Sequence, residues 1–416
     1  MKKTLKTLFA LGMSGFLLAA CQGQGQNADK PEAPAVTQSK EEAGESSSDK
    51  ATEEKADEKA DESKDDKKDE SSESESDAES EEEKDGDKDM AEADTPTEAP
   101  APASEMPETQ FVDPEEDQTD NFFVTANWVK DEMEKDEDLK IVEGSYGDEN
   151  YKKGHIPGAA LVDTNDVETL ESDWNLLEPE ELVKPFLKAG ITKDSRVVFY
   201  GDDMNAACRV AFAAYYLGAK DVKILDGTKE VWKKAGYDLS TDEPDITAAE
   251  DFGGDFPERT DEYIKTSDDL LDVKAEKPDL KIASVRSWDE FAGKTSGYDY
   301  IDNAGEIKDA VWAMASETAS DVNYIANTDG SIREPEAVFK EWKKWGIDKD
   351  TPVTFYCGTG WRNTTVFFLA KQAGFKDVSV QDGGWYEWDM KHQKDPAKYP
   401  VQEGIPGTDD FKVEDN

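Results

Sequence analysis

The feature that most constrains the fold is a gap-free internal repeat, in which the end of the chain matches its middle at a constant offset of 156 residues. The repeat spans more than 30 positions, and its matched residues are Tyr200 and Tyr356, Gly218 and Gly374, Lys220-Asp221 and Lys376-Asp377, Asp226-Gly227 and Asp382-Gly383, and Trp232 and Trp388. Self-similarity at one offset indicates that a structural unit was duplicated. We therefore predict two similar globular domains.

Short apolar runs alternate with segments of helical periodicity in each unit. Strands are predicted at 139–143, 196–200, 222–225 and 353–356, and helices at 124–133, 179–188, 206–217, 229–235 and 364–373. A Gly and Pro turn at 151–162 leads into a further strand. Strands that alternate with helices form parallel sheets covered on both faces. The predicted fold class is therefore α/β, with a central parallel sheet flanked by helices in each unit.

The composition of the chain sets the domain boundaries. Residues 121–240 and 258–410 each have domain size, and the linker at 241–257 is rich in Asp, Glu, Gly and Pro. Residues 21–120 are of low complexity, and 41–95 contain 26 Asp and Glu against 8 Lys, with no aromatic residue. Such a segment buries too little apolar surface to fold, so 21–120 are predicted to be disordered. We interpret them as a tether, and the alternative is an interaction tail for cations or basic partners.

The first 20 residues have the layout of a secretory signal peptide. Lys2, Lys3 and Lys6 precede an apolar stretch at 8–18, which is too short to span a membrane as a mature helix. The sequence Leu18-Ala19-Ala20-Cys21 resembles the bacterial lipobox, which implies cleavage before Cys21 and a lipid anchor on it. We therefore predict a lipoprotein at the extracytoplasmic face of the cell membrane. The alternative is an ordinary cleaved signal peptide with an incidental cysteine.

Charge and cysteine content exclude other classes of function. The net charge of −50 opposes nucleic-acid binding, which needs a basic surface. Apart from Cys21, only Cys208 and Cys357 remain, and two cysteines do not form a disulfide framework. Cys357 is the better candidate for a reactive thiol because it lies at a predicted strand-to-helix turn.

The turn at 357–362 carries most of the chemical information in the sequence. Cys357 ends an apolar strand, and Gly358 and Gly360 let the chain curl so that successive amides face the sulfur. The positive end of the following helix dipole favours a thiolate. Arg362 is placed to stabilise an anionic substrate or to fix the loop through hydrogen bonds. With only His155 and His392 in the chain, a thiolate held by dipoles fits better than a cysteine–histidine pair.

The same turn in the first unit lacks these groups. The repeat aligns Gly201 with Cys357 and Ala206 with Arg362, and it places two carboxylates, Asp202 and Asp203, in the loop. The first unit is therefore predicted to be catalytically silent. Cys208 aligns inside the next helix and is interpreted as a buried apolar residue.

Four stretches together resemble the tandem rhodanese family of sulfurtransferases. They are 151–159 (YKKGHIPGA), 284–291 (SVRSWDEF) with the weaker 305–310 (GEIKDA), the loop 357–362 (CGTGWR), and 382–388 (DGGWYEW). The resemblance extends over nearly all of the chain after residue 121. The sequence departs from the family at Ser284, where an Asp is usual, and in the degraded 305–310 motif.

The resemblance implies a silent N-terminal unit and an active C-terminal unit whose pocket opens at the domain interface. Cys357 would take the outer sulfur of an anionic donor such as thiosulfate, hold it as a persulfide and pass it to a thiol or cyanide-like acceptor. The amides of Gly358, Thr359, Gly360, Trp361 and Arg362 would form the cradle. Arg286 would bind the donor, Asp382, Trp385 and Trp388 would pack the core, and neither a metal nor an organic cofactor is implied. We further expect a monomer.

Two other functions stay open at this stage. The protein is a surface module that carries sulfur or senses oxidants without turnover, or it is a cysteine phosphatase or arsenate reductase. The second alternative is disfavoured because four residues separate Cys357 from Arg362, whereas the phosphatase signature has five.

Overall fold

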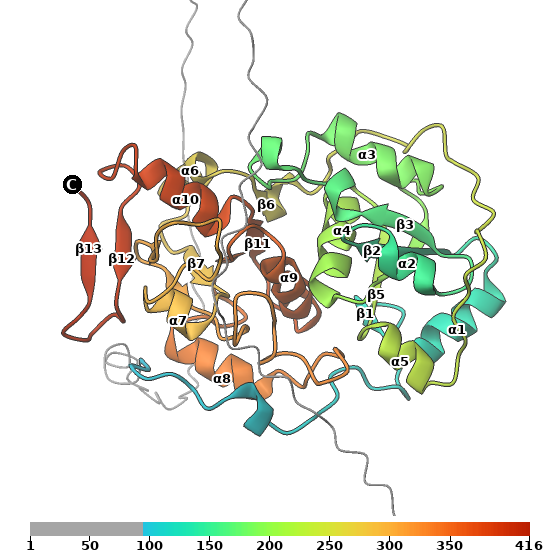
Figure 1. Cartoon of the computed structure of the whole chain (residues 1–416), viewed down its shortest axis with the longest axis horizontal. Coiled ribbons are helices and arrows are strands. Elements are labelled where there is room, and N and C mark those ends of the chain that lie inside the picture. The colour runs from blue at the N-terminus through green and yellow to red at the C-terminus, as the bar shows by residue number, and fades with distance from the viewer. Residues whose placement is uncertain (1–94) are drawn as a thin grey trace, which may run out of the picture. The chain divides into compact units, whose positions relative to one another are not determined.

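The computed structural model describes residues 95–416 (Figure 1). The predicted signal peptide, Cys21 and most of the acidic segment lie outside the described residues. Within residues 95–416, no helix is long and apolar enough to cross a membrane. The same residues contain no group of three or more His, Cys, Asp or Glu placed to hold a metal ion.

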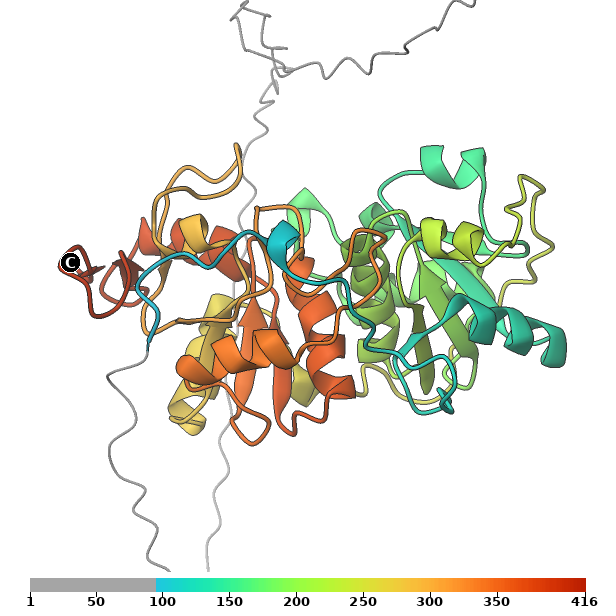
Figure 2. The ribbon, with the colours of Figure 1, turned by 90° about the horizontal axis from the view of Figure 1, so that it is seen from below.

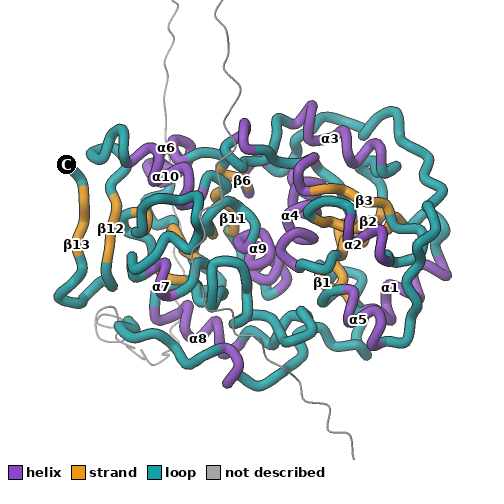
Figure 3. Tube along the Cα trace, in the orientation of Figure 1, coloured by secondary structure: helices purple, strands orange, loops and turns teal. Residues whose placement is uncertain are grey.

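The first domain is built on a parallel five-stranded sheet. Its strands have the order β1-β5-β4-β2-β3 and the bounds β1 Phe123–Val124, β2 Lys140–Ser145, β3 Ala160–Asp163, β4 Arg196–Tyr200 and β5 Asp221–Leu225. The helices are α1 Ala126–Lys135, α2 Glu149–Lys153, α3 Pro179–Lys188, α4 Met204–Leu217 and α5 Lys229–Lys234, with short 3-10 helices at Thr164–Asp166 and Leu170–Ser172. Figure 3 shows the strands at the centre of the domain with helices around them.

The second domain repeats this sheet. Its parallel strands have the order β6-β11-β10-β7-β9 and the bounds β6 Tyr263–Ile264, β7 Lys281–Ser284, β9 Val311–Trp312, β10 Val353–Tyr356 and β11 Val378–Gln381. The helices are α6 Ser267–Glu276, α7 Trp288–Phe291, α8 Glu336–Lys344, α9 Arg362–Gln372 and α10 Gly384–His392, and a 3-10 helix covers Thr260–Glu262. An antiparallel sheet of β8 Glu306–Ile307, β12 Val401–Glu403 and β13 Lys412–Glu414 is added at the C-terminus.

The two five-stranded sheets have the same strand order, which confirms the predicted α/β fold with two repeated domains. β4 and β10 occupy the same central position, and each leads through a loop into a buried helix, α4 or α9. Apart from Thr354, the buried residues of the two strands are Val, Phe and Tyr, as expected for strands covered on both sides.

Helices α4 and α9 pack against each other between the two domains (Figures 1 and 2). Phe212 of α4 meets Phe367 of α9 edge to face, with ring centroids 5.1 Å apart. Nearer the helix N-termini, the Thr365 hydroxyl donates to Oδ1 of Asn205 at 2.8 Å. The packing therefore brings the loops that precede α4 and α9 to the same side of the domain interface.

The prediction of disorder up to residue 120 is wrong for residues 95–120. This segment runs along the second domain (Figure 2), with Ala103 and Val112 buried and a 3-10 helix at Ala103–Glu105. Asn327 donates to the carbonyl of Thr109 at 2.6 Å, and the amide of Phe111 donates to the carbonyl of Ile332 at 3.3 Å. Composition did not reveal this order because it depends on backbone pairing with residues more than 200 positions away.

Candidate active site

Cys357 lies directly after β10, at the start of the predicted loop. Its side chain is 1% exposed, and its sulfur is 3.7 Å from Oδ1 of Asn363. Asn363 is itself fixed, because its amide nitrogen donates to the carbonyls of Phe355 at 3.1 Å and Gln381 at 2.9 Å. Helix α9 begins at Arg362, two residues earlier than predicted, so the helix N-terminus lies closer to the cysteine.

The loop leaves its backbone amides without acceptors. Among the hydrogen bonds of residues 95–416, none is donated by a backbone amide of residues 358–362. Trp361 at the N-cap of α9 provides no side-chain cap either. Uncapped amides at a helix N-terminus form a site for negative charge. The amides predicted to cradle an anion are therefore available in the folded chain.

Both loop glycines are required by close packing. Gly360 has φ +87°, a backbone conformation that side-chain-bearing residues rarely adopt. A Cβ on Gly358 would lie 2.3 Å from Cε2 of Tyr298, and a Cβ on Gly360 would lie 2.2 Å from Oδ1 of Asp382. These glycines were predicted to permit a tight turn. The structure adds a second reason for them, because only glycine leaves room for the side chains of Tyr298 and Asp382.

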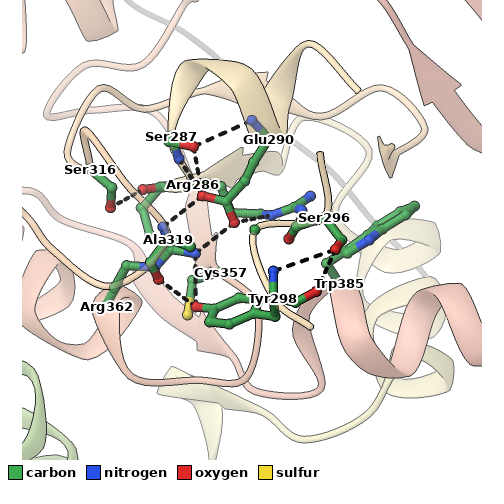
Figure 4. A network of polar contacts seen from close by, with 12 residues as sticks. Arg286, Ser287, Glu290, Ser296, Tyr298, Ser316, Ala319, Cys357, Arg362 and Trp385 are labelled. Atoms are coloured by element: carbon green, nitrogen blue, oxygen red, sulfur yellow. Dashed lines mark hydrogen bonds and ion pairs between the residues drawn. The ribbon is translucent and has the colours of Figure 1, made fainter. Parts of the chain in front are cut away.

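Arg362 holds the loop in place and does not present its charge as a free cation (Figure 4). Its guanidinium forms a bidentate pair with Glu290, with both N–O distances 3.0 Å. It also donates to the carbonyl of Thr318 at 3.0 Å and to the hydroxyl of Tyr298 at 3.1 Å. Of the two predicted roles for Arg362, fixing the loop is the one that these contacts support.

Burial disfavours ionisation of Glu290, but the guanidiniums of Arg362 and Arg286 outweigh it and lower the pKa of Glu290 to about 2. The carboxylate also accepts from the amide and hydroxyl of Ser287, at 2.9 and 2.8 Å. Glu290 therefore stays charged at neutral pH, and it connects Arg362 to the start of α7.

Arg286 is not placed to bind a donor, contrary to the prediction. It is fully buried, and it donates to Glu290 at 3.1 Å, to Glu306 at 2.7 Å and to the carbonyls of Gly305 and Ser296 at 2.7 and 2.9 Å. All three guanidinium nitrogens are thus committed to protein oxygens. Arg286, which follows β7, instead connects the 296–306 segment to the end of that strand.

Tyr298 covers the loop and was not predicted. Its hydroxyl donates to the carbonyl of Ala319 at 2.6 Å, and its ring lies against Gly358. Burial raises the pKa of Tyr298, and this outweighs the opposite effect of the neighbouring Arg362 guanidinium. Figure 4 shows the ring of Tyr298 beside Cys357. The phenol therefore stays neutral and remains a hydrogen-bond donor beside the thiol.

The first domain contributes two charged side chains to the loop of the second. Arg209 of α4 is fully buried and donates to Asp382 at 2.6 Å, to Glu168 at 2.7 Å and to the carbonyl of Gly360 at 3.3 Å. Glu168 also accepts the indole N–H of Trp361. Burial, with two carboxylates around one guanidinium, raises the pKa of Glu168 to about 7. The first domain therefore helps to position the loop of the second.

A cleft of about 290 Å³ opens between the domains at this point. Thr359, Trp361 and Arg362 contribute to its wall from the loop, and Asp203 and Asn205 from the corresponding loop of the first domain. The other lining residues are Tyr146, Thr164, Asn165, Glu168, Trp174, Tyr298, Tyr300, Ala319 and Ser320. Cys357 itself does not line the cleft in this conformation. The predicted pocket at the domain interface is thus present next to the loop.

The remaining sequence candidates are structural. Cys208 is buried, and burial raises its pKa to about 12. Both Cys208 and Cys357 are free thiols. The ring of His155 contacts the carbonyls of Tyr151 at 3.1 Å and Asp242 at 3.0 Å, as expected for a turn residue.

Sequence reasoning missed Tyr298, Glu290, Glu168 and Arg209. A signal existed for Arg209, which is the only charged residue in the apolar run 206–217, and for Glu290, which belongs to the 284–291 motif. No periodicity or spacing marked Tyr298 or Glu168, because their positions depend on how loops fold over the interface.

Fold and site define a two-domain α/β protein in which one of two duplicated strand-to-helix loops carries a cysteine. The model of the rhodanese-like domain matches residues 125–235 and 266–391. The chain belongs to the rhodanese-like family.

Curated relatives extend this result. The chain is 40% identical over 279 residues to thiosulfate sulfurtransferase YnjE of Escherichia coli (strain K12), covering 66% of this chain and 62% of that protein. It is 29% identical over 282 residues to sulfur carrier protein TtuD of Thermus thermophilus, covering 64% of this chain and 92% of that protein.

Solved structures resemble the chain as well. A crystal structure of the anaerobic ergothioneine biosynthesis enzyme from Chlorobium limicola, in complex with its natural substrate trimethyl histidine, is 33% identical. The match covers 70% of this chain and 72% of that chain with a TM-score of 0.64. Wild-type EanB is similar at 33% identity, with 70% of each chain covered and a TM-score of 0.64.

Proposed function

We propose that this protein is a sulfurtransferase that carries sulfane sulfur as a persulfide on Cys357. The observation that carries the proposal is the run of backbone amides without acceptors around a buried cysteine at the N-terminus of α9. Such a site stabilises a thiolate and its persulfide anion by dipoles alone, and it needs no nearby base.

The reaction balances without a cofactor. The Cys357 thiolate attacks the outer sulfur of an anionic donor such as thiosulfate, the S–S bond of the donor breaks, and sulfite leaves with the electron pair. A nucleophilic acceptor such as a thiolate or cyanide then attacks the terminal sulfur, and Cys357 leaves as a thiolate. The amides of 358–362 stabilise the negative charge in each state.

Similarity to EanB supports this choice of residue. EanB has been described with a persulfide on a cysteine, in a tetrahedral intermediate state with ergothioneine. Some of its described variants replace that cysteine, a threonine two residues after it, and a tyrosine 59 residues before it. Here Thr359 follows Cys357 by two residues and Tyr298 precedes it by 59. We infer that Tyr298 and Thr359 act beside Cys357, as the contact of Tyr298 with the loop also suggests.

A sulfur carrier without turnover is the second candidate, because one relative is named a sulfur carrier protein. Phosphatase or arsenate reductase activity gains no support from the site. Its arginine would have to face the oxyanion, and Arg362 is paired with Glu290.

The test is thiocyanate formation from thiosulfate and cyanide by the full chain, compared with the variant Cys357→Ser. We expect the variant to fall to the uncatalysed rate. Equal rates in the two proteins would refute the proposed function. A persulfide on Cys357 that no acceptor removes would favour the carrier instead.

We also propose that the protein is a monomer anchored by lipid on Cys21 at the extracytoplasmic face of the membrane. The support for the anchor is the sequence at 1–21 alone, and the monomer is an expectation that the measurement below tests. Labelling of growing cells with radioactive palmitate should mark the wild type and not Cys21→Ser. Equal labelling would refute the anchor, and light scattering of the purified soluble part would measure the oligomeric state.

A further inference from the structure

The carbonyl oxygens of the cysteine loop are held by donors outside the loop. The amide of Trp385 donates to the carbonyl of Cys357 at 2.9 Å, and the amide of Tyr386 donates to the carbonyl of Gly358 at 3.1 Å. Both donors lie in the first turn of α10. A trans peptide unit is planar, so its C=O and the next N–H point in opposite directions. Each contact therefore also fixes the direction of an amide of the cradle.

A third loop carbonyl is held by the other domain. Nη1 of Arg209, in α4, donates to the carbonyl of Gly360 at 3.3 Å. Among the hydrogen bonds of residues 95–416, this is the only one that the Gly360 carbonyl accepts. By the same geometry, the contact fixes the direction of the Trp361 amide. Arg209 therefore orients one member of the cradle from across the domain interface.

The guanidinium of Arg209 is itself fixed through all three of its nitrogens. It is fully buried, and both Nη atoms donate to the carboxylate of Asp382, at 2.6 and 3.2 Å. Its Nε donates to Glu168 at 2.7 Å. Asp382 in turn accepts the hydroxyl of Tyr263 at 2.6 Å and the amide of Leu176 at 2.8 Å. A planar fork held by two buried carboxylates is pre-organised, so it keeps its carbonyl acceptor in one place.

The loop packs directly against this ion pair. A Cβ on Gly360 would lie 2.2 Å from Oδ1 of Asp382 and 2.9 Å from Nη1 of Arg209. The backbone of Gly360 is thus in contact with both partners. A shift of the guanidinium must therefore move this backbone or leave a buried carbonyl without a donor, which is unfavourable.

The internal repeat supplies a comparison for this arginine. At an offset of 156 residues, Arg209 of α4 aligns with Thr365 of α9, and Asp382 aligns with Asp226. Asp226 accepts the amide of Ile332 at 2.7 Å, and no Lys or Arg of residues 95–416 forms an ion pair with it. Of the two matched loops, the guanidinium therefore serves the one that carries the cysteine.

We propose that Arg209 is a positioning residue for sulfur transfer, because it fixes the Trp361 amide in the anion cradle around Cys357. This inference deepens the proposed function and rests on it, since the cradle stabilises the Cys357 thiolate and its persulfide. The effect of Arg209 is one of geometry. Its positive charge is balanced by the Asp382 carboxylate at 2.6 Å, so little of its field reaches the sulfur.

The test measures the ionisation of Cys357 apart from sulfur transfer. The ultraviolet absorbance of the thiolate is followed against pH in the full chain, and the same titration with Cys357→Ser in each background is subtracted. Amides that donate to a thiolate lower its pKa, so loss of one should raise the midpoint of the titration. A residue that only stabilises the fold would leave this midpoint unchanged in the folded protein.

The first variant separates charge from geometry. Arg209→Lys keeps the charge, but one ammonium group cannot match a planar fork of donors. We expect the midpoint of Cys357 to rise by about one pH unit, which is about tenfold less thiolate below the midpoint. The kcat/KM for thiosulfate at neutral pH should fall by a similar factor. Folded Arg209→Lys with the wild-type midpoint would overturn the proposal.

A second variant decides the question if Arg209→Lys does not fold. Arg209→Met with Asp382→Asn replaces the ion pair by neutral groups, so the summed charge beside the loop is unchanged and neither charge of the pair is left alone. The midpoint of Cys357 should again rise by about one pH unit. An unchanged midpoint in this double variant would equally overturn the proposal.

The matched control removes a different buried ion pair. Lys229 and Glu143 of the first domain are buried and 2.9 Å apart, and neither has a hydrogen bond to residues 357–362 in the described part of the chain. Lys229→Met with Glu143→Gln should leave the Cys357 midpoint at its wild-type value, whatever its effect on thermal unfolding. An equal shift in this control would trace the shift to a general loosening of the fold and contradict the proposal.

The two proposals fail separately. A raised midpoint in the Arg209 variants, with no thiocyanate formation by the wild type, would remove the sulfurtransferase and leave Arg209 as the residue that orients the cradle. Thiocyanate formation by the wild type, with an unmoved midpoint in the Arg209 variants, would keep the sulfurtransferase and remove the role of Arg209.

Discussion

The loops before α4 and α9 descend from one ancestral turn, yet they treat the helix N-terminus in opposite ways. In the first domain, Asp203 caps α4, and its carboxylate accepts the amide of Asn205 at 2.8 Å. In the second domain, α9 has no side-chain cap, and its loop amides have no acceptor among the described residues. In the first loop a carboxylate of the chain itself therefore occupies the helix N-terminus. In the cysteine loop that position is free for the negative charge of a ligand.

The comparison also shows that side chains of the first domain contact the cysteine loop of the second. Arg209 and Glu168 come from the first domain and contact the backbone of Gly360 and the ring of Trp361 in the second. The first unit has Gly201 at the position of the cysteine, and its charged side chains at the interface hold the loop of the second domain.

The largest expected effect follows from removal of the arginine that distinguishes the cysteine loop. Arg362→Ala leaves the buried Glu290 carboxylate with Arg286 as its only cationic partner among the described residues. We expect a loss of about 3 kcal/mol in the free energy of unfolding, the lower end for a broken buried pair. Urea denaturation of the full chain measures it. Lys371→Ala on the same helix is the control, because its part-exposed pair with Glu262 should contribute less than about 1 kcal/mol. A similar loss of unfolding free energy in the two variants would show that the buried pair of Arg362 with Glu290 is not a major source of stability.

An attempt to reactivate the silent loop should fail. A Cβ at Gly201 would lie 2.6 Å from the carbonyl oxygen of Gly144, so Gly201→Cys is expected to destabilise the fold by about 1–3 kcal/mol. In a Cys357→Ser background it should restore no thiocyanate formation. Gly201→Ala separates packing from thiol chemistry, since it makes the same clash. Activity in the double variant would show that the two loops differ only in the cysteine.

Removal of the cap should distinguish the two helix N-termini. Asp203→Ala removes the acceptor for the Asn205 amide and should cost about 0.5–2 kcal/mol, whereas Asp203→Asn keeps a cap oxygen and should cost less. Thr359→Ala, at the aligned position of the cysteine loop, removes no cap and should change the free energy of unfolding by less than about 0.5 kcal/mol. Equal losses at Asp203 and Thr359, measured by thermal unfolding, would remove the distinction.

The last prediction concerns the pH dependence of stability. The pKa of Glu168 rises from 4.5 to about 7 on folding, so the folded state binds its proton more tightly than the unfolded state. The resulting stability is fully present below about pH 4.5 and is lost as the pH rises through 7, at about 1 kcal/mol per pH unit. Glu306 and Asp226, each with a pKa of about 7, add to this slope. Urea midpoints at several pH values should show a shallower slope in Glu168→Gln, and an unchanged slope would contradict the assignment.

Much of this structure followed from the sequence, because periodicity and the repeat at an offset of 156 residues can both be read from the residues directly. The strands 353–356 and 196–200 and the helix 179–188 were predicted with their observed bounds. The cysteine loop was recognisable because strand, glycines and helix are contiguous. The positions of the side chains around the loop were harder to predict from the sequence. Arg286 was assigned to the donor, but the carboxylates of Glu290 and Glu306, one turn and one strand away, bind it instead. Tyr298 and residues 95–120 reach the second domain through long-range contacts that no local pattern records.

The most direct test of the difference between the two loops is intact-protein mass spectrometry after incubation with thiosulfate. We predict one added sulfur, about 32 Da, located on Cys357 by peptide mapping and removed by cyanide. Cys208 should stay unmodified because it is buried and its pKa is raised to about 12. No added sulfur, or sulfur on Cys208 in place of Cys357, would contradict the assignment of chemistry to the uncapped loop.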